Sequence, residues 1–302
     1  MAKISFTRLR EVVCFRLWRC LVGRKASSGS VTFCLSHYNA PDFLNATLHA
    51  IRRHYPDARI IVADASSVWP EFCAAKSVCA RYEAELHPLL NCHRHTGLLN
   101  YMFRKITTPL AVYLDQDCVL LESLDLLLQK MAEGILLAGP RDEIGITHPN
   151  ACALYPKLRN GRLRINPQFI HASLMVMNIG QMRPWIGRQP FRWDPAWGPH
   201  PLERYYGFTE RVRRKAPRAI LDLDSEHTGY GMGTVYLYGG RPLAYHNWFS
   251  GQVFGQSGKM EGLLDAGWLR TEMKRFLADY WDDKVDFKLA STTHEIGGGA
   301  NR

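Results

Sequence analysis

The chain has 302 residues, of which 46% are hydrophobic and 22% charged, and its formal net charge is +10 at pH 7. These ordinary fractions predict one large α/β domain with short appendages. The positive charge favours an anionic partner, but we exclude nucleic acid because no recognition motif or array of basic and aromatic residues accompanies it. The eight cysteines are scattered without a C-x-x-C pair, which argues against a disulfide framework and indicates free thiols in a reducing cytoplasm.

Residues 1–30 are the first expected segment, a basic amphipathic helix followed by a linker. Seven basic residues and one acid place more than half of the net charge here. Apolar residues at helical spacing form one face, namely Phe6, Leu9, Val13, Leu17, Cys20 and Leu21. Such a helix can bind an anionic membrane surface through residues 1–25, or pack on the domain with its basic face in solvent, and both interpretations stay open. Because the chain has no apolar run of about 18 residues, we expect no membrane-spanning helix.

Strands and helices alternate in the prediction for residues 31–122. Strands are expected at 31–35, 58–63, 84–90 and from 110 onward, and helices at 39–55 with Asn39 as N-cap, after Pro70, and at 96–106. This alternation predicts a mostly parallel sheet with crossover helices. Because ligands bind such sheets beyond the carboxyl ends of the strands, we expect Ser36, Asp64 and Asp115 on one rim.

Two aspartates separated by one residue interrupt the last of these strands. Side chains alternate along a strand, so Asp115 and Asp117 point to the same side, about 7 Å apart along the backbone. Paired carboxylates at the end of a buried strand repel each other and lose hydration. Their oxygens suit a hard divalent cation such as Mg2+ or Mn2+, with a solvated turn as the alternative.

Further elements are predicted after residue 122. A helix starts near Ser123, strands lie at 135–138, 169–178 and 242–245, and further helices open at 221 and cover 268–280. An irregular segment is expected at 140–168. The aromatic and basic residues of 184–218 suit a carbohydrate acceptor, but a packed cover with a solvated basic face is favoured. His171 and Ser173 share one face of the strand at 169–178, where a core hydrogen-bonding role is favoured over a substrate contact. Residues 286–302 are expected to be a flexible tail.

The order of these elements resembles the GT-A glycosyltransferases, especially those similar to family 2. Ile61-Val62-Ala63-Asp64-Ala65-Ser66 resembles the second-strand element of that family, although a glycine often stands where Ala65 is. Asp115-Gln116-Asp117 resembles its D-x-D motif, and the strand that ends in His246 resembles its closing part.

This resemblance implies a Rossmann-like GT-A domain over residues 31–285, with a nucleotide-binding half at 31–122 and an acceptor half at 123–285. It implies that the sugar donor is bound by Ser36, Asp64, Arg94, Asn100 and Asp115, and that Asp115, Asp117 and His246 hold a divalent cation, Mn2+ or Mg2+. Asp224 and Glu226 are the expected candidates for a catalytic base that takes the proton of the acceptor hydroxyl, with helix capping as their alternative role.

The function implied is transfer of a sugar from a nucleotide-diphosphate sugar, expected to be UDP-linked, to a carbohydrate or lipid-linked acceptor, as in the synthesis of cell-surface polysaccharide or glycolipid. We expect a cytoplasmic enzyme, with peripheral binding to the inner face of the membrane as an option. A sugar nucleotidyltransferase is one alternative, but such enzymes usually carry a glycine-rich phosphate loop, and residues 36–41 contain no glycine. A non-catalytic membrane-surface binding protein with the same fold is the other.

Overall fold

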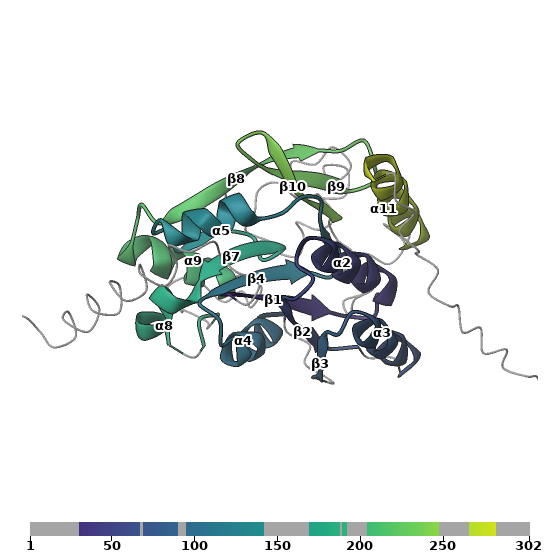
Figure 1. Ribbon diagram of the computed structural model, residues 1–302, viewed down its shortest axis with the longest axis horizontal. Helices are drawn as coiled ribbons and strands as arrows, with labels where there is room; N and C mark the ends of the chain where they lie inside the picture. The colour runs from purple at the N-terminus through teal and green to yellow at the C-terminus, as the bar shows by residue number, and fades with distance from the viewer. Residues whose placement is uncertain are drawn as a thin grey trace, which may run out of the picture.

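The computed structural model describes residues 30–66, 69–89, 95–141, 169–187, 189–191, 204–247 and 266–281. In these residues it contains seven α-helices and one ten-stranded sheet with the strand order β3-β2-β1-β4-β7-β6-β8-β9-β10-β5 (Figure 1). The predicted α/β fold is confirmed. The predicted basic amphipathic helix, nearly all of the segment 140–168, Arg94 and the predicted tail lie outside the described residues.

Four parallel strands form the part of the sheet that carries the predicted rim. They are β1 (Val31–His37), β2 (Arg59–Asp64), β3 (Glu85–Pro88) and β4 (Leu110–Asp115), and the helices that connect them are α2 (Pro41–His54), α3 (Trp69–Arg81) and α4 (His95–Lys105). The predicted alternation is confirmed here. The register pairs Ser36 with Asp115 and His37 with Asp64, so the carboxyl ends of β1, β2 and β4 align.

Six strands with mixed directions complete the sheet. They are β5 (Cys118–Leu120), β6 (Leu137–Pro140), β7 (Leu174–Asn178), β8 (Ile220–His227), β9 (Gly233–Tyr238) and β10 (Arg241–Asn247). β7 is antiparallel to both β4 and β6, and β6 is parallel to β8. The single sheet runs through both of the predicted halves, whose division at residue 122 stays a prediction.

The position of β5 shows that the sheet curls back on itself. β4 and β5 are nearly consecutive in the chain but lie far apart in the strand order. Strands in a flat sheet are about 4.8 Å apart, whereas the chain from Asp115 to Cys118 can reach only about 10 Å. Antiparallel pairing of β5 with β10 places Cys118 directly across from His246. The curl therefore returns the last strand to the end of β4.

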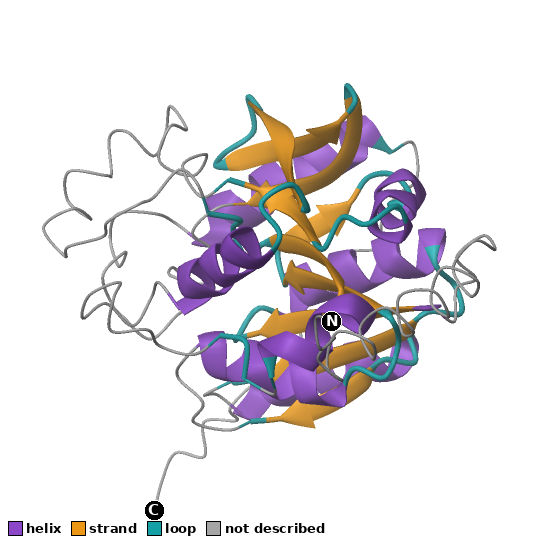
Figure 2. Ribbon diagram, turned by 90° about the vertical axis from the view of Figure 1, so that its left-hand side faces the viewer, coloured by secondary structure: helices purple, strands orange, loops and turns teal. Residues whose placement is uncertain are grey.

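Helices cover both faces of the sheet (Figure 2). Phe33 and Leu35 of β1 belong to the apolar core that also contains side chains of α2, α3, α5 (Asp125–Ala132) and α11 (Ala266–Tyr280). Cys34 belongs to a second core, with side chains of α4, α8 (Ile179–Ile186) and α9 (Arg204–Lys215). Successive strand residues thus enter two cores, where each large apolar side chain contributes about 1.5–3 kcal/mol.

The segment after residue 220 does not open a helix, contrary to the prediction. It is strand β8, in which Leu223 is buried and Leu221 packs against the first core, while Asp222, Asp224 and Glu226 are exposed. Exposure therefore alternates with a period of two, which is the period of a strand rather than of a helix. The acidic residues suggest a capped helix start only when this alternation is ignored.

The starts of helices α2 and α8 also differ from what the sequence predicts. The N-cap of α2 is Ala40 rather than Asn39, which instead adopts a left-handed φ of 47° that asparagine tolerates. Helix α8, which is not predicted from the sequence, starts directly after β7, where the side chain of Asn178 caps it by accepting a hydrogen bond from the Gln181 N–H.

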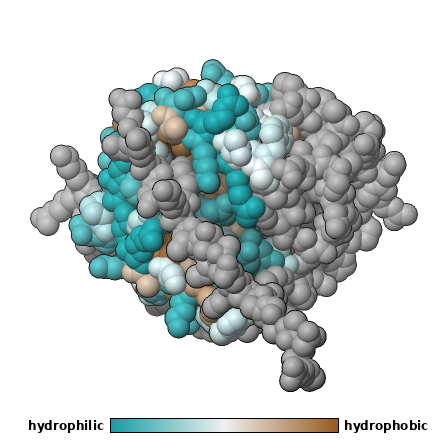
Figure 3. Space-filling model, turned by 90° about the vertical axis from the view of Figure 1, so that its right-hand side faces the viewer, coloured by the Kyte–Doolittle hydropathy of each residue, from teal (hydrophilic) through white to brown (hydrophobic). Residues whose placement is uncertain are grey.

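Membrane-spanning helices, the polarity of the surface and the cysteines can be compared with the predictions in the described part of the chain. None of the described helices is long and apolar enough to cross a membrane. On the face shown in Figure 3, hydrophilic side chains predominate among the described residues. The cysteines of the described part, Cys34, Cys73, Cys79 and Cys118, are free, as predicted.

Candidate metal centre

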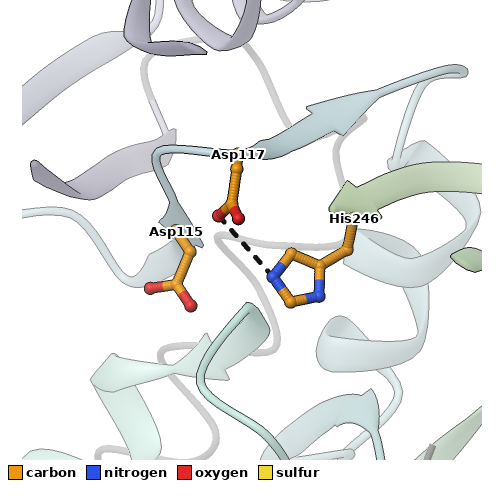
Figure 4. A group of neighbouring side chains, drawn as sticks. All are labelled: Asp115, Asp117 and His246. Atoms are coloured by element: carbon orange, nitrogen blue, oxygen red, sulfur yellow. Dashed lines mark ion pairs between the residues drawn. The ribbon is translucent and has the colours of Figure 1, made fainter. Parts of the chain in front are cut away.

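Asp115, Asp117 and His246 each bring one ligand atom to within 4.8 Å of the other two (Figure 4). Asp115 ends β4, Asp117 directly precedes β5, and His246 lies near the end of β10. Asp117 and His246 are only 4% and 3% exposed, and Asp117 Oδ1 lies 3.6 Å from His246 Nε2. The structure thus brings the three predicted metal ligands together, although His246 is 129 residues away from Asp117 in the chain.

Backbone and side-chain hydrogen bonds hold the turn between the two aspartates. Gln116, the residue between them, accepts a hydrogen bond from the Tyr38 N–H at 2.6 Å and donates one to the Tyr38 carbonyl at 3.2 Å. Its own carbonyl accepts from the Thr47 hydroxyl at 2.7 Å. The Asp117 carbonyl accepts from the Asn247 N–H at 3.1 Å, which ties the turn to the residue after His246. Gln116 therefore fixes the loop, while the carboxylates on either side remain for the site.

Polar neighbours on the rim keep Asp115 ionised. Its Oδ1 accepts a hydrogen bond from the Ser36 hydroxyl at 3.0 Å and lies 3.1 Å from His95 Nε2. Burial raises the pKa of Asp115, but His95, His246 and His171 outweigh burial and hold that pKa below its usual range. Burial lowers the pKa of His95, but the Asp115 carboxylate more than offsets this, so the pKa of His95 is raised.

A third histidine lies beside His246. The rings of His171 and His246 are 5.9 Å apart, and His171 Nδ1 accepts a hydrogen bond from the Ser173 N–H at 3.1 Å. Burial and the neighbouring His246 lower the pKa of His171 to about 3, so its imidazole is neutral at neutral pH. The Ser173 hydroxyl makes a buried hydrogen bond with Tyr236, the core role favoured from the sequence.

The residues present fit a divalent cation. Two carboxylates that converge in a site of low exposure repel each other unless a cation joins them. Carboxylate oxygens suit both Mg2+ and Mn2+, and the imidazole nitrogen of His246 favours Mn2+. The site is thus a candidate divalent-metal centre with two oxygen ligands and one nitrogen ligand.

Asp64 lies on the same rim, at the end of β2, and is fully buried. Its Oδ1 is close to His37 Nδ1 at 2.6 Å and accepts hydrogen bonds from the Ser66 hydroxyl at 2.6 Å and the Ser66 N–H at 3.2 Å. His37 Nε2 accepts from the Ala40 N–H at 3.3 Å, so the remaining proton of a neutral His37 is on the nitrogen that faces Asp64. The second carboxylate oxygen of Asp64, Oδ2, is buried and has no hydrogen-bond partner among the described residues. Asp64 therefore keeps one acceptor oxygen for another group.

Other predicted site residues are not brought to the metal centre. Both amide atoms of Asn100 bond the backbone of Phe191, at 3.1 and 3.0 Å, so Asn100 anchors that segment, and its part in donor binding stays a prediction. Ser225 pairs with Tyr236 across β8 and β9, and Tyr236 bonds His246. Because side chains alternate along a strand, the residues on either side of Ser225 face away from Tyr236. Those residues are Asp224 and Glu226, and the structure gives no support for either as the base.

Sequence reasoning missed two neighbours of the cluster. His95 belongs to the run Cys92-His93-Arg94-His95, in which Arg94 alone is predicted as a site residue. Its position at the start of α4, one residue before the predicted helix, could have indicated a side chain on the rim. No pattern in the sequence indicates Tyr236, because its contact with His246 depends on the pairing of β9 with β10.

Fold and site together define an α/β protein with a candidate divalent-metal centre at the carboxyl ends of its parallel strands. No model of a known protein family matches the sequence, and no curated protein matches it either.

Three solved structures to which this chain is similar are glycosyltransferases. A mannosyltransferase from Pyrobaculum calidifontis, in complex with GDP-Man and Mn2+, is 15% identical with a TM-score of 0.37, and the match covers 59% of this chain and 56% of that one. Glucosyl-3-phosphoglycerate synthase from Mycobacterium tuberculosis, in complex with UDP, is 14% identical with a TM-score of 0.42, covering 66% and 70%. The glycosyltransferase GlyE of Streptococcus pneumoniae is 11% identical with a TM-score of 0.39, covering 65% and 45%.

The match thus spans little more than half the length of the mannosyltransferase. Identity and TM-score are low in all three comparisons. The functional conclusion therefore rests on the residues of the site.

Proposed function

We propose that the protein is a metal-dependent glycosyltransferase that moves a sugar from a nucleotide-diphosphate sugar to an acceptor. The observation that carries the proposal is the cluster of Asp115, Asp117 and His246 at the end of β4. Asp64 supports it, because its buried Oδ2, which has no hydrogen-bond partner in the described part of the chain, lies on the same rim, two strands away in the sheet. A metal ion can bind the diphosphate of such a donor, and a carboxylate can accept hydrogen bonds from its nucleoside.

Each residue of the rim has a defined part in donor binding. Asp64 Oδ2 accepts a hydrogen bond from an N–H of the base or a hydroxyl of the ribose. Asp117 and His246 would hold the metal ion, together with Asp115. Ser36 and His95 orient Asp115 through its Oδ1. When bound, the metal ion offsets the charge of the diphosphate and stabilises it as the leaving group.

The transfer itself exchanges one bond for another. The bond from the anomeric carbon to the diphosphate oxygen breaks, and the diphosphate takes the electron pair. A new bond forms between that carbon and the acceptor hydroxyl oxygen, whose proton is released. The acceptor we propose is the carbohydrate or lipid-linked hydroxyl expected from the sequence. Association with a membrane through residues 1–25 stays a prediction, because those residues lie outside the described part.

The variant Asp117→Asn tests the proposal, because it keeps the shape of the side chain and removes the charge of a metal ligand. We expect Mn2+-dependent hydrolysis or transfer from a panel of nucleotide sugars to fall at least 100-fold, about 2.7 kcal/mol of transition-state stabilisation. Asp57→Asn is the matched control, since Asp57 is exposed and lies in the turn before β2. Full activity of Asp117→Asn, or of the wild-type protein in excess chelator, would contradict the metal role.

The two alternatives predict different products and ligands. A sugar nucleotidyltransferase would release pyrophosphate from a nucleoside triphosphate and a sugar phosphate. A membrane-surface binding protein would bind anionic vesicles and show no affinity for nucleotide sugars in the presence of Mn2+. Either result, with no sugar transfer, would replace our proposal.

A further inference from the structure

A buried hydrogen-bonded chain lies behind the candidate metal centre. The Ser173 hydroxyl is 2.9 Å from the Tyr236 hydroxyl, which is 2.8 Å from His246 Nδ1. Ser173 and Tyr236 are 0% exposed and His246 is 3% exposed. The other ring nitrogen, His246 Nε2, faces Asp117 at 3.6 Å. The two nitrogens of one imidazole therefore serve different neighbours, a hydroxyl on one side and the metal cluster on the other.

A hydroxyl can donate or accept, so the chain can run in two directions. When Tyr236 accepts the proton of Nδ1, it donates its own proton to Ser173, and Nε2 keeps a lone pair for a metal ion. When Tyr236 donates to Nδ1, the ring proton is on Nε2 and points at Asp117. Only the first direction makes His246 a metal ligand. The buried partner on Nδ1 thus decides which nitrogen is available and how the ring is oriented.

We propose that Tyr236, held by Ser173, is a positioning residue that presents His246 Nε2 to the metal ion. This assignment rests on the proposed function only in that both require a metal ion at Asp115, Asp117 and His246. Neither Ser173 nor Tyr236 contacts the metal ion or the donor in this assignment. Both act through His246, whose Nδ1 is bonded by the Tyr236 hydroxyl.

The strand that carries His246 also offers a matched control. Tyr245 is the preceding residue, is buried like Tyr236, and stacks on Phe276 with a ring separation of 4.2 Å. Its hydroxyl has no hydrogen-bond partner among the described residues. The variants Tyr236→Phe and Tyr245→Phe therefore each remove one buried hydroxyl from a packed ring, but only the first removes the partner of His246.

The experiment titrates the full-length chain with Mn2+ alone, following free Mn2+ by electron paramagnetic resonance, and repeats the titration in competition with Mg2+. For Tyr236→Phe we expect Mn2+ binding to weaken about 10- to 100-fold, the usual effect of losing such a partner. The preference for Mn2+ over Mg2+ should fall as well, because the nitrogen ligand is the one that Mn2+ favours. Ser173→Ala should give a smaller loss of the same kind, and Tyr245→Phe should bind as the wild-type protein does.

Three outcomes would overturn this assignment. Wild-type affinity in Tyr236→Phe would do so, and so would equal weakening in Tyr236→Phe and Tyr245→Phe, which indicates a general packing effect. Absence of Mn2+ binding by the wild-type chain would overturn both the assignment and the metal role. The expected pattern of Mn2+ affinities without sugar transfer would instead support the assignment and contradict only the proposed function.

Discussion

Individual carboxylates on the rim differ in what surrounds them, and this separates their roles. Asp115 is surrounded by donors and histidines that keep its charge, while Asp64 is fully buried, with Oδ1 hydrogen-bonded and Oδ2 without a hydrogen-bond partner among the described residues. An acceptor left unsatisfied in a protein core costs about 1–3 kcal/mol. A bound nucleoside would supply the missing hydrogen-bond donor. Binding of the nucleotide sugar would therefore recover this free-energy cost.

At Asp64 we predict a loss of nucleotide affinity without loss of metal affinity. Asp64→Asn can still accept from His37 and Ser66 through its amide oxygen, but its NH2 group then replaces Oδ2 and meets the ligand donor with another donor. Binding of a nucleoside diphosphate should weaken by about 1.5–3 kcal/mol, roughly 10- to 150-fold. Calorimetric titration measures the affinity for the nucleoside diphosphate, and the affinity for Mn2+ is the internal control. Unchanged nucleotide affinity would remove Asp64 from the donor site.

Strands β9 and β10 are the elements that place His246. Antiparallel pairing sets Gly233 against Asn247 and Thr234 against His246. A side chain at Gly233 has no room, because a Cβ there would lie 2.2 Å from Tyr245 Cε2 and 2.6 Å from Thr228 Oγ1. The glycine thus allows Tyr245 to lie across the strand and stack on Phe276 of α11. Its small size, rather than a special backbone conformation, is what the structure needs.

We therefore predict that Gly233→Ala destabilises the protein. Relief of the contact requires Tyr245 or the backbone of β9 to move, which costs about 1–3 kcal/mol as overpacking. Chemical denaturation measures this as a lower free energy of unfolding. Gly229→Ala is the control, because a Cβ at Gly229 meets nothing within 4 Å and its backbone needs no positive φ. Equal effects in the two variants would show that crowding at Gly233 is not the cause.

The metal centre forms because the sheet is curled, so that β5, at the far end of the strand order, lies next to the end of β4. Asp117 and His246 come from positions 129 residues apart and meet only because β5 pairs with β10. Helix α11 adds a second connection between the ends of the chain, since Leu269 accepts a hydrogen bond from Asn247 and Arg270 pairs with Asp42 of α2. A ligand that joins Asp117 to His246 therefore stabilises the closed sheet.

Metal binding should accordingly raise the thermal stability of the metal-free protein. At an Mn2+ concentration 100-fold above its dissociation constant, binding to the native state alone adds about 2.7 kcal/mol. A thermal-shift series with increasing Mn2+ measures this, and a chelator should reverse it. In Asp117→Asn the shift should vanish, whereas in Asp57→Asn it should remain. A wild-type melting temperature that is insensitive to Mn2+ would contradict the metal centre.

Local patterns were enough to predict the rim of the parallel strands. Alternation of strands and helices over residues 31–122 is encoded in short apolar periods and turn residues, and it places Ser36, Asp64 and Asp115 at carboxyl ends that the structure aligns. The strand period predicts Asp115 and Asp117 on one side, but β4 ends at Asp115 and a turn carries Gln116 and Asp117, so it is the turn that brings the two carboxylates into one cluster. After residue 220 the structure has strand β8 in place of the predicted helix, and Asp224 and Glu226, which the resemblance implied as candidate bases, have no structural support there.

Contacts between distant segments could not be predicted in this way, because they depend on pairings that no local period encodes. His246 was named from a resemblance, but its closeness to Asp117 follows from the pairing of β5 with β10. The bond from Tyr236 to His246 follows from the register of β9 and β10, and Asn100 bonds a segment about 90 residues away. The amino-acid order thus specified which carboxylates reach the rim, while sheet curvature and strand register decided which histidine and which hydroxyl meet them there.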